Sequence, residues 1–196
     1  MTRVILSVWL LVAAACSPQS QHDKGVKNDM HSTTWTCDNA VAAIRARDFI
    51  AWRGLAGTCK DAVLKAFPPA YDGEGQIQLG SEGVRVAVLR RKAPGYSHTL
   101  DVQTASGAVV RVDIEHPELA GPVPALLSTL GAPDGKLDYY DGVLLMPGGQ
   151  QVWPARGLAL YLDETGAQVK RIALFKPTDL AHYRRELEPD LRIHEE

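Results

Sequence analysis

Three cysteines are the residues of this chain with the most definable chemistry, because a thiol can be acylated, oxidised or used as a metal ligand. Cys16 stands alone near the N-terminus, whereas Cys37 and Cys59 form a Cys-x21-Cys pair. A redox pair favours Cys-x-x-Cys spacing, and a structural zinc site needs four ligands, which no nearby histidines complete. The chemistry of this pair therefore depends on the compartment in which the domain folds.

Cys16 follows an apolar run at residues 4–12 and three alanines. The run is shorter than the roughly 20 apolar residues of a membrane-spanning helix and has the length of a secretory signal. The segment resembles a lipobox, the export signal of bacterial lipoproteins, in which the cysteine is acylated and begins the mature protein. Leucine is commonest in that family where this chain has Ala13, so cleavage without lipidation is the alternative.

The lipobox resemblance implies palmitate at Cys16 and an address in the cell envelope. Aspartate after the cysteine favours the inner membrane in that family, and this chain has Ser17. The resemblance therefore implies an outer-membrane anchor with the domain facing the periplasm. Multiple acyl chains hold a protein stably, so the domain needs no membrane-binding surface of its own.

In an oxidising periplasm, we expect Cys37 and Cys59 to form a disulfide that closes a loop of about 23 residues. Each cysteine lies near the start of a predicted helix. A tight helical hairpin would place those starts at opposite ends, so the connector 49–57 must carry the chain back.

Other candidate catalytic residues do not form a pattern. The histidines are scattered, and the chain has no HExxH, Gly-x-Ser-x-Gly or phosphate-loop motif. The carboxylate pairs Asp72/Glu74 and Asp138/Asp141 lie in segments rich in turn residues, where solvated side chains are the common case. We therefore expect no catalytic residues, no metal and no cofactor.

One aromatic cluster is a candidate surface for a protein partner. Tyr140, Trp153 and Arg156 are of the residue types enriched in binding hot spots. Aromatic residues on strands are more often part of a core, so burial is the alternative. The prediction for these three residues is partner contact.

The chain divides by composition into a leader, a tether and a folded part. Residues 1–15 read as the signal peptide, and residues 16–34 are polar and without periodicity, as in a flexible tether. The rest reads as a first unit at 35–118 and a second at 119–196. With 21 basic and 23 acidic residues, the formal net charge is −2, which does not favour a nucleic-acid partner.

Helical patterns come first in the folded part. Asp38 or Asn39 can cap one helix, and Thr58 with Asp61 three residues later can cap a second that prolines 68 and 69 end. Further helices are expected at 122–130 and after 177–178. Strands are predicted at 84–88, 99–103, 110–114, 139–145, 150–153, 158–162 and 169–175.

Alternation in the strand at 110–114 predicts one core face and one wet face for the sheet. The apolar residues at 110, 112 and 114 face one way, whereas Arg111, Asp113 and Glu115 face the other. Helices followed by antiparallel strands, twice over, indicate an α+β fold. We expect a helical hairpin packed on an antiparallel sheet, in an order that suggests two tandem units.

Two segments, Gly57–Pro68 and Leu126–Asp134, resemble a motif of the small lipoprotein of the outer-membrane β-barrel assembly machine. The first has Phe67-Pro68-Pro69 where that family has Leu-Gly, and the second lacks the Gly-Thr opening. Two such units in tandem are also the architecture of β-lactamase inhibitory protein. These resemblances imply the fold more than the function.

Three functions follow as hypotheses. The first is a non-enzymatic accessory that binds an envelope protein or helps envelope assembly. The second is an inhibitor or immunity protein against a periplasmic enzyme. The third is an enzyme whose site no sequence motif reveals.

Overall fold

The structure is a computed structural model. It describes residues 34–71, 74–80, 84–93, 96, 99–141 and 144–188, which belong to one compact unit beginning at Thr34. Cys16 and the expected signal peptide lie outside the described residues. Of the helices that the structure describes, none is both long and apolar enough to cross a membrane.

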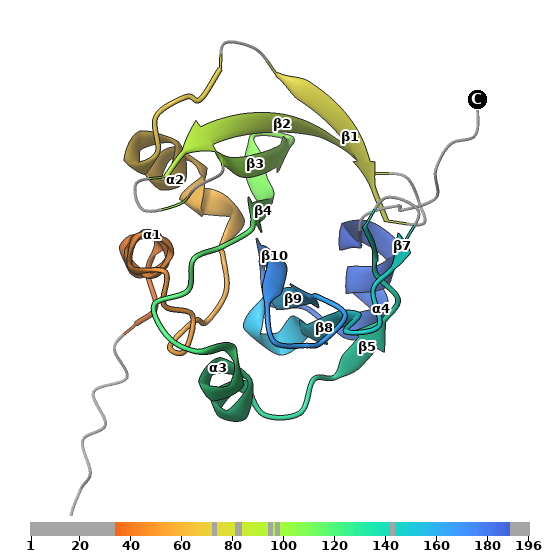
Figure 1. Ribbon diagram of the computed structural model, residues 1–196. Helices are drawn as coiled ribbons and strands as arrows, with labels where there is room; N and C mark the ends of the chain where they lie inside the picture. The colour runs from red at the N-terminus through yellow and green to blue at the C-terminus, as the bar shows by residue number, and fades with distance from the viewer. Residues whose placement is uncertain are drawn as a thin grey trace, which may run out of the picture. The chain divides into compact units, whose positions relative to one another are not determined.

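Eight antiparallel strands form one continuous sheet (Figure 1). Four strands follow one another in chain order, and the next four run back so that the last pairs with β4. The order across the sheet is β1 (Gly75–Leu79), β2 (Val84–Lys92), β3 (Thr99–Ala105), β4 (Ala108–Glu115), β10 (Val169–Phe175), β9 (Leu158–Leu162), β8 (Gln150–Trp153) and β5 (Gly135–Leu137). A separate short pair, β6 (Tyr140–Asp141) with β7 (Leu144–Leu145), lies between β5 and β8 in the chain.

Helices cover both faces of the sheet. Figure 1 shows α1 (Cys37–Ala46), α2 (Lys60–Ala66) and α3 (Val123–Leu130) on one side and α4 (Leu180–His182) on the other. Single 3-10 turns precede α2 at Gly57–Cys59 and follow β8 at Pro154–Arg156. Helix α4 continues as a π-helix, Tyr183–Leu187, and we call residues 180–187 the C-terminal helix. The main core lies under α1 to α3, and a smaller aromatic cluster lies under the C-terminal helix.

Helix α1 begins earlier than the predicted caps. Thr36 is the cap: its hydroxyl accepts from the N–H of Asn39 at 3.3 Å, and the Asn39 side-chain oxygen accepts from the N–H of Thr36 at 2.9 Å. This reciprocal pair satisfies two donors that a helix start leaves free. Thr58 caps nothing, because it lies inside the 3-10 turn.

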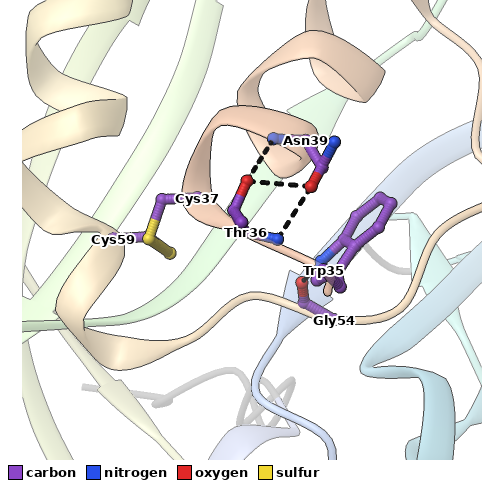
Figure 2. The surroundings of a disulfide bond; sticks show 6 residues. All are labelled: Trp35, Thr36, Cys37, Asn39, Gly54 and Cys59. Atoms are coloured by element: carbon purple, nitrogen blue, oxygen red, sulfur yellow. Dashed lines mark hydrogen bonds between the residues drawn. A yellow bond between two sulfur atoms is a disulfide. The ribbon is translucent and has the colours of Figure 1, made fainter. Parts of the chain in front are cut away.

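The prediction of a helical hairpin is wrong. The disulfide Cys37–Cys59 joins the first residue of α1 to the residue before α2, with Cα atoms 5.2 Å apart (Figure 2). In a hairpin, these starts would be separated by the length of a ten-residue helix, about 15 Å. The connector at 47–56 carries the chain back instead: Phe49, Trp52 and Leu55 are buried, and the N–H of Leu55 donates to the carbonyl of Phe175 at 2.9 Å. The α+β class remains compatible with the structure.

The prediction of two tandem units is also corrected, because the two sets of strands form one sheet. Strand β10 pairs with β4 from Arg171 opposite Glu115 to Phe175 opposite Arg111. Among the described residues, α3 alone precedes the second set of strands and α4 follows it, so no helical hairpin opens that half. Joining the sets covers the edges of β4 and β10, which would otherwise present unpaired backbone groups.

Removing the confirmed disulfide tests how much it constrains the unfolded chain. We expect the double substitution Cys37→Ala and Cys59→Ala to lower the free energy of unfolding by about 3 kcal/mol, because a loop of this length regains its freedom. Urea unfolding of the purified protein measures the loss, and the reduced natural chain should show a similar one. A natural chain with two free thiols in its mass spectrum would contradict the pairing.

Candidate functional site

The predicted contact residues lie in different environments. Trp153 is 3% exposed, packs in the main core and donates from Nε1 to the carbonyl of Gly131 at 3.2 Å. Arg156 is half-buried in the 3-10 turn after β8. Tyr140 lies on β6, and its side chain is outside the described part of the structure. Partner contact by these residues stays a prediction, and Trp153 offers almost no surface for it.

The structure describes the side chain of one member of each predicted carboxylate pair. Glu74 and Asp138 are exposed, whereas Asp72 and the Asp141 side chain lie outside the described residues. Within the parts that the structure describes, no three residues of the types His, Cys, Asp and Glu lie close enough to hold a metal ion.

A buried polar network occupies the face of β4 that was predicted to be wet. Arg111 is fully buried and donates from Nε to a carboxylate oxygen of Asp113 at 2.7 Å. Its other nitrogens donate to the Tyr161 hydroxyl at 3.0 Å and to the backbone carbonyl of Leu187. Gln103 donates to the second oxygen of Asp113 at 2.7 Å. The expectation of a wet face is therefore wrong here, because the C-terminal helix covers it.

Phenols and a second amide complete the network. The hydroxyls of Tyr161 and Tyr183 lie 3.2 Å apart, and Gln150 donates to both. Burial raises the pKa of each phenol, which keeps both neutral. Burial alone lowers the pKa of Arg111, but Asp113 and the phenols outweigh it, so this pKa lies well above its usual value. The guanidinium therefore stays charged, with acceptors on Asp113, Tyr161 and the Leu187 carbonyl.

The network positions the C-terminal helix rather than exposing a reactive group. A buried ion pair offers little net stability, but removing one partner alone costs about 3–5 kcal/mol. Arg111 is the cation that bonds the last turn of this helix, at Leu187, to the middle of the sheet. The helix is thereby held in one position over the sheet.

Two glycines seat the C-terminal helix against the two outermost strands. Gly80, after β1, donates to the carbonyl of Glu188 at 2.6 Å, and a Cβ there would lie 1.9 Å from the Arg185 carbonyl oxygen. A Cβ on Gly135, in β5, would lie 2.7 Å from Leu180. The helix therefore contacts both edge strands of the sheet, as Figure 1 shows for α4 between β1 and β5.

A groove beside the start of α3 is the candidate binding site. Its volume is about 470 Å³, within the range of sites that hold small ligands or short peptide segments. Two segments line it: 116–124, from the end of β4 into the first turn of α3, and 167–170, before and at the start of β10. Three prolines, Leu119 and Val123 supply its apolar surface, polar atoms supply nearly as much, and its titratable residues are His116 and Lys170. Such a lining can pack against apolar groups and attract an anion.

Sequence reasoning missed this groove because its two walls are distant along the chain. The N–H of His116 donates to the carbonyl of Lys170 at 2.7 Å, a contact across the β4–β10 pairing. The cluster of prolines at 117, 122 and 124 was the available signal. Without the strand order of the sheet, the sequence did not indicate which segment lies opposite those prolines.

Comparison with protein-family models, curated proteins and solved structures found no match to this chain.

The close contact of the C-terminal helix with Gly80 can be tested by comparing two glycines of similar backbone conformation. Gly80 has φ +69° and Gly107 has φ +80°, but a Cβ on Gly107 would meet nothing within 4 Å. We expect Gly107→Ala to cost about 1 kcal/mol from backbone strain alone. Gly80→Ala should cost about 1–3 kcal/mol more through its clash with Arg185.

Hydrogen exchange locates the effect. Gly80→Ala should speed amide exchange at residues 180–188, whereas Gly107→Ala should leave it unchanged. Equal losses of stability in the two variants, with the same exchange pattern, would show that the helix does not depend on this seat.

Proposed function

We propose that this protein is a lipoprotein acylated at Cys16 and held in the outer membrane, whose domain binds another envelope protein without chemistry of its own. The lipobox-like segment supports the anchor. The disulfide Cys37–Cys59 is of a kind that persists in oxidising compartments, and it supports a periplasmic domain. The observation that carries the binding function is the groove beside α3.

The lining of the groove indicates the kind of partner. Its titratable residues, His116 and Lys170, are both basic, and its lining has no carboxylate. Proline side chains are already rigid, so they lose little freedom when another chain packs on them. An extended segment with an acidic residue beside apolar side chains therefore complements this surface in charge and in polarity.

The anchor is tested by labelling and fractionation of the producing cells. Labelled palmitate should enter the natural chain, and Cys16→Ala should abolish labelling and release the protein into the soluble periplasm, because the acyl chains supply the membrane affinity. Ser17→Asp is the matched control: it should keep the label and move to the inner membrane. A membrane-bound Cys16→Ala protein would contradict the anchor.

The groove is tested by crosslinked affinity capture from intact envelopes. Lys170→Glu reverses a charge in the lining, and we expect about tenfold weaker capture of the partner, equal to about 1.4 kcal/mol. Lys136→Glu makes the same change at an exposed residue of β5 outside the lining, and should capture normally.

Each outcome of the capture has a meaning. Equal capture by the two lysine variants would rule out the groove as the contact. A captured enzyme whose activity falls on binding would identify an inhibitor rather than an assembly accessory.

A further inference from the structure

Strand β1 is an exposed strand at the end of the sheet. Among the described residues it pairs only with β2, in unbroken register from Gly75 opposite Val88 to Leu79 opposite Val84. Four of its five residues are exposed, and Ile77 exposes 41% of its surface. Among the described residues, none pairs with the other side of its backbone, whose N–H and C=O groups can take another strand.

The sequence of β1 lacks the usual protection of an edge. Natural edge strands carry lysines, prolines or bulges that prevent pairing with other chains. Residues 75–79 read Gly-Gln-Ile-Gln-Leu, with no charge and no proline, and their pairing with β2 contains no bulge. An edge of this kind is a template for a further strand, so the remaining question is which strand it takes.

The order of its residues points to a second copy of this chain. Gln76 and Gln78 flank Ile77 symmetrically. In an antiparallel pair centred on Ile77, each isoleucine faces its copy, each glutamine faces a glutamine, and Gly75 faces Leu79. No like charges oppose one another, and a two-fold axis through Ile77 makes the contact self-complementary.

We propose that two copies of this protein pair edge to edge through β1, in antiparallel register centred on Ile77. The strand is already ordered for this pairing. Leu79 is fully buried, and Gly80 is bonded to Glu188 behind the C-terminal helix, so one end of β1 is fixed in the free protein. Binding then requires little additional ordering.

The dimer is weak and depends on protein concentration. Pairing five residues buries less than the roughly 1,200 Å² typical of stable interfaces. The proposal does not depend on the lipid anchor or on the groove, which β1 does not line. It can therefore be tested on the purified full-length protein over a series of concentrations.

Cysteine crosslinking tests the register directly. Opposed residues of paired strands have Cβ atoms about 4.5–5.5 Å apart, whereas diagonal neighbours are about 7–8 Å apart. Ile77→Cys should therefore form a disulfide-linked dimer on oxidation. Gln76→Cys, on the same strand, lies diagonal to its own copy and should link poorly alone, but the double variant Gln76→Cys/Gln78→Cys should link well. The natural chain controls for its own cysteines, and peptide mass spectrometry identifies the bond.

Charge at the centre of the contact gives a second readout. Ile77→Lys would place two ammonium groups opposite each other, and we expect at least about tenfold weaker self-association by sedimentation. Ile50→Lys is the matched control, because Ile50 is 45% exposed in the connector before α2. Circular dichroism checks that each variant is folded.

Three outcomes would overturn the proposal: a folded Ile77→Cys protein that stays monomeric, equal linking by Ile77→Cys and Gln76→Cys, or equal self-association of the two lysine variants.

Discussion

The bonding of the buried Arg111 guanidinium to the C-terminal helix is the interaction on which this domain's arrangement depends. A charged group with no access to water must find acceptors, and Arg111 finds them on its own strand, on β9 and on the last turn of the helix. The helix therefore has one position over the sheet. That position seats it against Gly80 and Gly135, and so orders the ends of both outermost strands.

The disulfide has a comparable role on the other face. It holds the starts of α1 and α2 together, so the connector between them must run back toward the start of α1 rather than turn tightly. Trp35 donates to the carbonyl of Gly54 at 2.8 Å and packs edge-on against Trp52, with ring centroids 5.6 Å apart (Figure 2 shows Trp35 and Gly54 beside the disulfide). The first described residues are thus tied to this connector. In the proposed lipoprotein, a force on the lipid anchor would act on the domain at Trp35, which is bonded to this connector.

The groove and the β1 edge serve different kinds of contact. The groove combines apolar and polar surface with two basic residues and suits a side-chain contact, whereas the edge offers backbone groups and suits strand pairing. They share no residue, so a self-paired protein can keep both grooves free for partners. Two linked grooves would bind a partner with two matching segments more tightly than either groove alone.

Local patterns in the sequence predicted much of the secondary structure. The strands Gln150–Trp153, Leu158–Leu162 and Val169–Phe175 lie where the sequence predicted them, because strand-forming residues and turn residues act over short distances. The two outermost strands, β1 and β5, were missed. Both are short, and β1 is exposed on almost every residue, so neither has a hydrophobic pattern.

Tertiary structure decided what those elements do together. From alternation, Arg111 and Asp113 belong on a wet face, and only the return of residues 180–187 over β4 buries them. The groove likewise forms because β10 pairs with β4 and brings 167–170 beside 116–124. The sequence by itself indicated the lipobox-like segment and most strands, which depend on neighbouring residues, and it offered Cys37 and Cys59 as the only cysteines besides Cys16. Burial of charge and the walls of a groove depend on residues far apart in the chain, so only the folded strand order sets them.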